Sequence, residues 1–521
     1  MNRRPRSTVN DRELRLWKVG WALGLAFAAA ILAAGGIFYS LVELLDFKEI
    51  DSTSRLDAKT LFDLVKLSFG VVAGAGALVA LVVAYRRQRV DEAGAHREAT
   101  RLHTERFSQA VDKLGSDSPA VRLGGVHALA GLADDAPDDN LRQTCIDVLC
   151  AYLRLPFSPD PGDLLDPLPD GTSPSEERRD AHQAKKDRYH AFREVRHTIL
   201  RLIGDHYRIP EGTHRSWQGC NLDLTRVTLD SSVNFSGATF SGGMVTFNGA
   251  TFSGGMVTFN GATFSDGIVT FNGATFSGGS VSLISAKFSG SSVTFNGATF
   301  SSSSVTFNGA TFSDGIVTFG GATFSGGMVN FNGAEFSGGM VTFSGATFSG
   351  GSVTFNGATF SGGSVTFSGA TFSGGSVSFV SATFSDGIVS FVSARFSGGS
   401  VTFISARFSC GSVTFGSARF SGSSVDFGSA TFSGSSVDFG SATFSDGIVS
   451  FVSARFSDGM VDFISARFSD GSVTFNGAEF SGGSLGFQAT TGPVPVGLLA
   501  AVGTPVLSTV RLRADWLPSV P

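Results

Sequence analysis

The sequence predicts three parts in order along its 521 residues: a hairpin of two transmembrane helices, a small all-α domain and a long β-solenoid. Two uncharged apolar spans near the start predict the hairpin, and apolar residues at helical spacing after them predict the small domain. A strict 12-residue repeat in the second half predicts the solenoid, because such short units bury their apolar faces only when they stack.

The predicted hairpin consists of the spans 19–41 and 67–85, neither of which carries a charge. At about 1.5 Å per residue, each span is close to or above the ~30 Å of a hydrocarbon core. Basic residues dominate the tail 1–18, whereas the loop 42–66 holds six acidic and four basic residues. The positive-inside rule then predicts two cytoplasmic termini, an external loop, and contact with the lipid bilayer through both spans. The alternative is a cleaved signal peptide followed by one anchor, which would place everything after Arg86 outside.

Residues 86–155 are predicted to form a small helical domain. Ser118 and Pro119 are typical of a helix start, since serine caps free N–H groups and proline fits the first turn. Apolar residues then recur at helical spacing on both sides of a turn, as in a single HEAT-like pair of helices. A linker rich in proline and charge is expected at 156–186, and an apolar stripe predicts a helix at 187–207 that leads to the solenoid.

From Val233 onward a 12-residue unit repeats without insertion or deletion. In the unit VTFNGATFSGGM, Val245 precedes Phe247 by two positions, and Ala250 precedes Phe252 by two. Residues two apart share one face of an extended chain, so these four side chains are expected to form an inward core ladder. One unit cannot bury two phenyl rings alone, whereas stacked units can.

The two halves of each unit, V-T-F-N-G and A-T-F-S-G, resemble the repeats of the pentapeptide-repeat family, which centre on a large apolar residue with a small one two positions before it. The resemblance covers residues 233–487, and two additional residues per pentapeptide pair make this a 12-residue variant. It implies a right-handed β-helix over 217–487, with one side of the coil per pentapeptide. The whole arrangement also resembles membrane-anchored bacterial members of the family, which implies a multi-pass location in the inner membrane.

The additional residues leave two coil sizes open, one made of two repeat units and one made of a single unit. A 12-residue coil would stack Arg395, Arg407 and Arg419 directly on one another. A 24-residue coil would put Arg407 on the opposite side and would place Arg455 beside Glu479. The resemblance favours the 24-residue coil, which corresponds to about ten coils.

The two end coils of a solenoid expose unpaired strand edges, which invite association with other edges. Helix 187–207 is expected to shield the first coil. The apolar residues of the tail 488–521 are expected to cap the last one.

Motifs for catalysis are missing from the sequence. All eight histidines precede the repeat, no HExxH or cysteine–histidine metal spacing occurs, and the many Gly-Gly steps contain no P-loop signature. We therefore expect no enzyme, no cofactor, no metal site and no small-molecule substrate.

The expected function is protein interaction or scaffolding with an unidentified protein partner. The exposed surface up to residue 390 is mostly Ser, Thr, Gly and Asn, and most charges of the repeat lie beyond it. A partner-binding face is therefore expected in the C-terminal half, on Arg395, Arg407, Arg419, Arg455 and Arg467.

The main alternative is a DNA-mimic regulator of a topoisomerase, of the gyrase-protecting type, because some members of the resembled family present acidic faces. The stretch 231–490 carries eleven acidic and six basic side chains, which is sparse beside the one charge per ~1.7 Å of duplex DNA. Nucleic acid itself is not expected as a partner, since the net charge is −5. A remote alternative is an ice-binding or adhesive solenoid, suggested by outward Thr251, Thr263 and Thr275.

Overall fold

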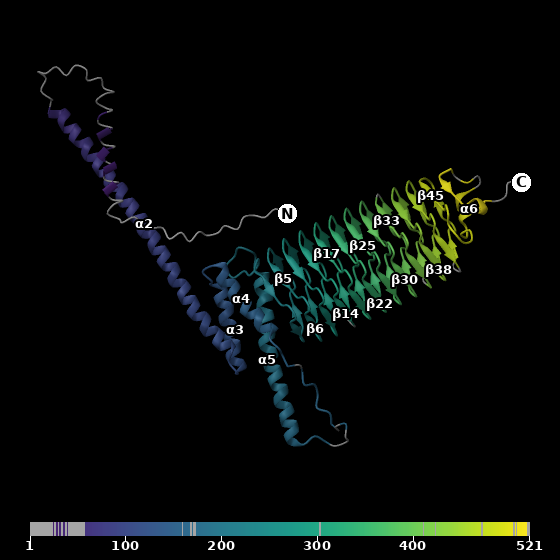
Figure 1. Cartoon of the computed structure of the whole chain (residues 1–521), viewed down its shortest axis with the longest axis horizontal. Coiled ribbons are helices and arrows are strands. Elements are labelled where there is room, and N and C mark those ends of the chain that lie inside the picture. The colour runs from purple at the N-terminus through teal and green to yellow at the C-terminus, as the bar shows by residue number, and fades with distance from the viewer. Residues whose placement is uncertain are drawn as a thin grey trace, which may run out of the picture. The chain divides into compact units, whose positions relative to one another are not determined.

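The computed structural model describes nine residues between 24 and 39 and the following ranges: 58–158, 160–166, 169, 173–301, 304–409, 411–422, 424–469, 472–503, 506 and 508–517. The chain divides into two compact units, residues 1–102 and 103–521. Figure 1 shows the helices at the start of the chain and the stacked strands that follow.

The predicted transmembrane hairpin is wrong: in the part of the chain that the structure describes, no helix is both long and apolar enough to cross a membrane. The span 67–85 belongs to α2 (Ala58–Leu114), a single helix that continues directly into Arg86 and Arg87. Most of 19–41 lies outside the described residues. The same finding contradicts the predicted multi-pass location in the inner membrane.

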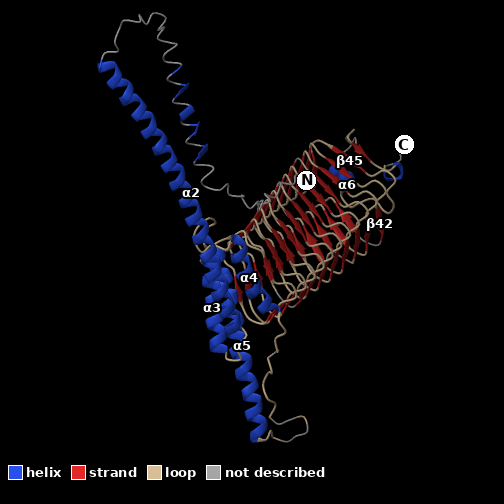
Figure 2. Cartoon of the chain, turned by 60° about the vertical axis from the view of Figure 1, so that its left-hand side comes forward, coloured by secondary structure: helices blue, strands red, loops and turns tan. Residues whose placement is uncertain are grey.

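Three further helices follow in the second unit: α3 (Pro119–Asp134), α4 (Asp139–Arg154) and α5 (Glu176–Arg208). Leu129 of α3 and Ile146 of α4 are fully buried in one core. The antiparallel helices α3 and α4 pack on each other, and α5 packs against α3 (Figure 2).

Helix α5 begins at Glu176, well before the helix predicted at 187–207, and occupies part of the range predicted as linker. Ser175 explains this start, because its side-chain oxygen accepts a hydrogen bond from the backbone N–H of Arg178. Glu176 and Glu177 lie in the first turn, where negative charge is favourable. A serine cap and acidic first turn therefore extend the helix through a stretch without an apolar stripe.

The remainder is a right-handed β-solenoid of about 12 turns, built from four parallel sheets. One complete coil consists of β5 (Met244–Thr246), β6 (Thr251–Ser253), β7 (Val257–Thr258) and β8 (Thr263–Ser265), which belong to sheets A, B, C and D in that order. Figure 2 shows the strands of successive coils stacked side by side.

Each regular strand pairs with the equivalent strand of the next coil, which is the fourth strand after it in the chain. Thr275 lies opposite Thr299, and Phe276 lies opposite Phe300. The 24-residue coil is therefore confirmed. There are more turns than the ten predicted, because the lead-in before Val233 also coils, through β1 (Leu222–Asp223) and β2 (Thr228–Leu229).

Sheet A is the longest sheet, with 13 strands. After β1 and β5 it contains β9 (Ile268–Thr270), β13 (Ser292–Thr294), β17 (Ile316–Thr318), β21 (Met340–Thr342), β25 (Ser364–Thr366), β29 (Ile388–Ser390), β33 (Ser412–Thr414), β37 (Ser436–Asp438), β41 (Met460–Asp462), β45 (Ser484–Gly486) and β46 (Val510–Arg511).

Phenyl rings fill the interior of the solenoid. The four residues of the predicted core ladder, Val245, Phe247, Ala250 and Phe252, are at most 4% exposed. Phe247 is parallel to Phe271 in the next coil, at a ring-centroid distance of 4.8 Å. This distance equals the spacing of neighbouring strands, so each phenyl column follows the rise of its sheet.

Some of the corners between sheets B and C require glycine. A Cβ atom added to Gly279 would lie 1.7 Å from the backbone oxygen of Gly255 in the preceding coil. Gly351 meets the oxygen of Gly327 at 1.8 Å in the same way. At Gly279 and Gly351 the coils therefore approach too closely for a side chain, whereas serine occupies the equivalent position in other coils, as at Ser231.

Helix α5 covers the first coil. The ring of Tyr207 packs on that of Phe240 at a centroid distance of 5.1 Å. Arg208 donates hydrogen bonds to the backbone oxygens of Ser236 and Asn234, at 2.7 and 2.9 Å. These contacts give partners to backbone groups that would otherwise form an open edge.

The C-terminal segment covers the last coil. Strand β46 pairs in parallel with β45, with Val510 opposite Leu485. The short α6 (Leu498–Val502) packs beside the last strand of sheet D, and Trp516 contacts Phe487 at a centroid distance of 5.6 Å. The final phenyl column is thus closed by an indole ring.

Candidate functional site

The five arginines predicted as a partner-binding face divide between two opposite sides of the solenoid. Sheet B carries three of them, on β30 (Arg395–Ser397), β34 (Arg419–Ser421) and β42 (Arg467–Ser469). Sheet D carries the other two, on β32 (Arg407–Ser409) and β40 (Arg455–Ser457). Because the sheets follow one another in the order A, B, C, D, sheets B and D face away from each other.

The sheet B arginines form a short basic row. Arg395 lies directly opposite Arg419, and Thr443 separates Arg419 from Arg467. The structure records no ion pair between these three side chains and any described carboxylate. On sheet D, by contrast, Arg455 pairs with Glu479.

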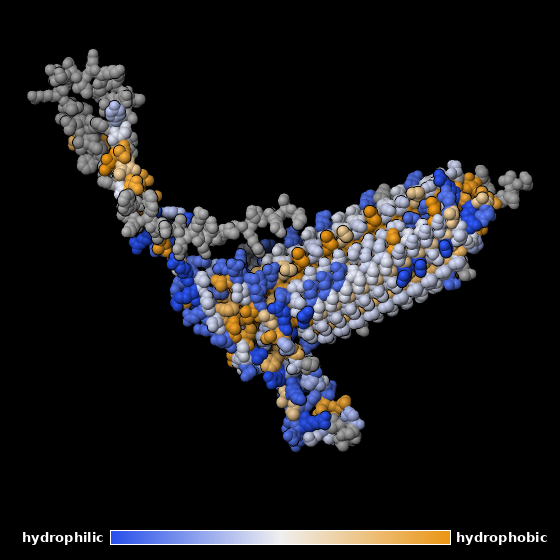
Figure 3. All heavy atoms as spheres, in the orientation of Figure 1, coloured by the Kyte–Doolittle hydropathy of each residue, from blue (hydrophilic) through white to orange (hydrophobic). Residues whose placement is uncertain are grey.

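A second surface feature, which the sequence analysis missed, is a line of apolar side chains along sheet A. We call it the apolar row. Each member occupies the first position of its strand and is about half exposed, between 45% and 54%. The row comprises Met244, Ile268, Ile316, Met340, Ile388 and Met460. Figure 3 shows this apolar line on the side of the solenoid where Figure 1 labels β5, β17 and β25.

The apolar row is denser than the equivalent positions on sheet C. Met244 and Ile268 lie in adjacent coils and face each other in register, as do Ile316 and Met340. Sheet C has three exposed apolar residues at these positions, with no two in adjacent coils: Met256, Met328 and Ile448. In the sequence, these residues come immediately before the valine of each unit. Only the coil length shows that successive units place them alternately on sheet A and on sheet C.

Aspartates border the apolar row. Those at the corner between sheets D and A come two residues before a member of the row and adopt left-handed backbone conformations, with φ of 51–54°: Asp266, Asp314, Asp386 and Asp458. Aspartate tolerates this region better than most residues. The strands of sheet A from β5 to β45 contain no lysine or arginine.

Two more aspartates lie on sheet A itself and face each other. Asp438 is opposite Asp462 in the next coil. Burial raises the pKa of Asp462; the backbone N–H of Ile464, which donates a 2.7 Å hydrogen bond to its carboxylate, acts in the opposite direction, and the charge of Asp438 raises the pKa further. The side of the solenoid that carries the apolar row is therefore acidic.

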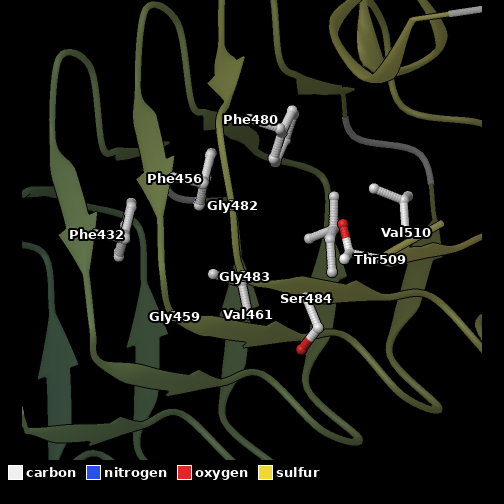
Figure 4. A pocket seen from close by; sticks show the side chains of 11 residues that line it. Phe432, Phe456, Gly459, Val461, Phe480, Gly482, Gly483, Ser484, Thr509 and Val510 are labelled. Carbon is white, nitrogen blue, oxygen red and sulfur yellow. The ribbon is translucent and has the colours of Figure 1, made fainter. Parts of the chain in front are cut away.

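A small cavity lies beside the last coils (Figure 4). Its volume is about 10 Å³, and phenylalanine, valine and glycine residues line it, among them Phe456, Phe480, Gly483 and Val510. A space of this size holds at most one water molecule. It is a packing gap where β46 replaces a regular coil, and not a ligand site.

Comparison with known proteins agrees with the geometry of the repeat. A family model described as pentapeptide repeats matches residues 331–383, with nine copies. The same 12-residue unit and the same 24-residue register continue on both sides of the matched segment. No curated protein matches the chain.

Two solved structures show limited similarity. QnrB1, described as a plasmid-mediated fluoroquinolone resistance protein, has 16% identity over 35% of this chain and 89% of its own, with a TM-score of 0.14. The alginate lyase AlyF-OU02 in complex with G6 has 9% identity over 60% of this chain and 85% of its own, with a TM-score of 0.18. At these values neither likeness bears on function. The matched segment and the stacked coils support one assignment: the solenoid is built from repeats of the pentapeptide-repeat type.

Proposed function

We propose that the β-solenoid is a protein-interaction module that binds its partner through sheet A rather than a catalyst. The observation that carries this proposal is the apolar row, in which six half-exposed Met and Ile side chains follow one sheet, twice as many as sheet C has at the same position. From Met244 to Met460 the row spans nine coil steps, which corresponds to about 43 Å. Association would remove this apolar line from water.

The charges beside the row define the partner that fits. Asp314, Asp386 and Asp458 border it on one side, and Asp438 and Asp462 lie on the sheet itself. No basic residue in strands β5 to β45 of sheet A neutralises them. The partner is therefore a protein segment that presents apolar side chains flanked by lysine or arginine.

The distribution of acids favours this proposal over DNA mimicry. Asp266 and Asp314 are two coils apart and Asp314 and Asp386 are three coils apart, which corresponds to roughly 10 and 14 Å. The phosphates of one DNA strand are about 3.4 Å apart. Apart from the facing pair Asp438 and Asp462, the acids are thus too widely spaced to copy a duplex, whereas they suit charge pairing around an apolar contact.

The test is affinity capture with the full chain as bait, comparing wild type with the variant Ile316→Ser, Met340→Ser, Ile388→Ser. Serine occupies the same position in other coils, as at Ser364 and Ser412, so the fold tolerates it. The matched control makes the same kind of change on sheet C: Met256→Ser, Met328→Ser, Ile448→Ser.

We expect at least one partner to be depleted about tenfold by the sheet A variant and retained by the sheet C variant, a loss equivalent to ~1.4 kcal/mol of binding free energy. Binding of the purified partner, which should weaken as salt is raised, completes the assignment. Equal capture by all three baits would contradict it. Protection of a topoisomerase without any dependence on sheet A would instead favour the DNA-mimic alternative.

A further inference from the structure

A cavity of about 580 Å³ lies in the helical part of the second unit, lined by residues of α3, α4 and α5 and by residues that follow α4. This volume is within the range of about 300–1,000 Å³ that is usual for small-molecule sites. The cavity is separate from sheet A and from the function proposed for it. Its lining combines cations with aromatic rings.

Four cationic side chains line the cavity: Arg122, Lys185, Arg188 and Arg196. No aspartate or glutamate is among the lining residues. Within the described part of the chain, no ion pair joins any of the four to a carboxylate. The cavity therefore carries an excess of positive charge that an anion would neutralise.

Two carboxylates lie near this wall, and both are engaged. Asp160 accepts a 2.9 Å hydrogen bond from the backbone N–H of Gly162. Asp230 accepts a hydrogen bond from the Tyr189 hydroxyl, and Arg193 Nε lies 3.8 Å from its other oxygen. Arg196, which is 6% exposed, donates a 2.8 Å hydrogen bond to the backbone oxygen of Thr228. Its guanidinium is thus fixed in place although no carboxylate pairs with it.

Aromatic rings hold the guanidinium groups at the wall of the cavity. Arg122 and Arg188 lie over the ring of Phe192, at 4.5 and 5.5 Å from its centroid. Arg196 lies over the ring of Phe157 at 4.9 Å. Arg122 also donates a 3.1 Å hydrogen bond to the hydroxyl of Tyr152. These contacts orient the donors before any ligand arrives, which lowers the entropy that binding would cost.

We propose that this cavity binds a nucleoside phosphate. Guanidinium groups match the oxygens of a phosphate with paired hydrogen bonds, which Arg188 is placed to supply. Arg122 already donates to the backbone oxygen of Ser116 and to the Tyr152 hydroxyl, and would add its remaining N–H groups. Phe157 and Tyr189, with ring centroids 5.4 Å apart and planes tilted by 32°, provide an apolar aromatic surface for a base. A phosphate alone would leave this aromatic surface and most of the volume unused.

The site would couple ligand binding to the helical domain. Arg122 is on α3, Tyr152 on α4 and Arg188 on α5, so one ligand would contact all three helices. Helix α5 in turn packs on the first coil through Tyr207 and Phe240. A bound ligand is therefore expected to raise the unfolding temperature of this domain.

The test uses the full chain and the fluorescent nucleotide N-methylanthraniloyl-ATP, with ATP, adenosine and inorganic phosphate as competitors. We expect saturable binding that ATP displaces, with adenosine and phosphate each weaker by about tenfold or more, because each makes only part of the contacts. Absence of saturable binding up to about 1 mM at low salt overturns the proposal. Competition by phosphate as effective as that by ATP also overturns it.

Charge reversal at the exposed Arg188 supplies the residue-level test. Arg188→Glu should weaken binding about tenfold or more, and Lys185→Glu provides a second exposed position should the first variant unfold. The matched control is Arg178→Glu, also an exposed arginine of α5 but almost three turns, or about 15 Å, away along the helix. An equal loss of affinity in the Arg178→Glu variant would mean that binding depends only on the net charge of the protein. That result would overturn the assigned site.

Discussion

Arg455 and Glu479 face each other on sheet D in consecutive coils, with Arg455 Nε 3.2 Å from a carboxylate oxygen of Glu479. They occupy equivalent positions in the repeat, separated by one full coil. Both side chains are well exposed, at 67% and 64%. Their pairing therefore reports the register of the coil and contributes little to its stability.

Removing this ion pair should have a small effect. Glu479→Gln is expected to change the free energy of unfolding by less than about 1 kcal/mol, because solvent screens an exposed pair. Thermal unfolding at low and high salt measures it. A large loss of stability that disappears in high salt would show that the pair matters more than its exposure indicates.

The phenyl column should be sensitive to a missing ring but not to a smaller apolar one. Phe307→Ala is expected to destabilise the solenoid by about 3–5 kcal/mol, because a buried cavity remains. Phe307→Leu should cost less than about 1.5 kcal/mol, since Leu283 already occupies the equivalent position one coil earlier, at 2% exposure. Unfolding midpoints of the two variants measure the difference, and similar midpoints would contradict the stacking argument.

Gly279 should tolerate no side chain. Gly279→Ala is expected to destabilise by about 1–3 kcal/mol or more, because its Cβ would meet the oxygen of Gly255 at 1.7 Å. The control is Gly416→Ala, where the nearest atom, Thr414 Oγ1, lies at an ordinary 3.4 Å. The unfolding midpoints of the two variants measure the difference. A Gly279→Ala variant as stable as Gly416→Ala would mean that the coils can move apart at this corner.

The facing aspartates of sheet A predict a pH dependence. The pKa of Asp462 is raised by its burial, against the hydrogen bond from Ile464, and raised further by the charge of Asp438. Since the folded state disfavours the charged form, this carboxylate costs stability at neutral pH, and the cost disappears as pH falls through its raised pKa. Asp462→Asn should therefore raise the unfolding temperature at pH 7 and have no effect well below that pKa.

Asp426→Asn is the matched control for that experiment. Asp426 occupies the same position on sheet C but faces Thr402 and Ser450 instead of a carboxylate. Asp426→Asn should raise the unfolding temperature at pH 7 by less than Asp462→Asn does. A destabilised Asp462→Asn variant at pH 7 would contradict the argument.

The C-terminal segment should be needed to keep the rod monomeric. Deleting 488–521 would expose the edge of β45, which β46 now covers through the pairing of Leu485 with Val510. We expect this truncation to aggregate in size-exclusion chromatography with light scattering. A monomeric truncated chain would show that the edge needs no cover, and deletion of 518–521 alone serves as the control.

Residues two apart on an extended chain share a face whatever the fold around them, so the inward positions of Val245 and Phe247 were predictable from spacing alone. The same reasoning from local sequence gives a wrong prediction for residues 67–85, which it assigns to a membrane span. The absence of charge predicts a membrane span there, whereas these residues form part of one long helix that continues into a charged segment.

Surface features depend on contacts between distant residues. Ile316 and Met340 become neighbours only in a 24-residue coil, which places Met328, midway between them in sequence, on a different sheet. Arg122 and Arg196 line the same cavity because three helices pack together. That packing cannot be predicted from the spacing of residues in the sequence.

Sequence alone determined the solenoid, because the spacing within the repeat shows which side chains must be buried. Tertiary structure decided the coil length, and with it the apolar row, the division of the arginines between sheets B and D, and the cationic cavity. The reason is physical: burial acts on each short strand separately, whereas the arrangement of the surface follows from how corners and helices pack.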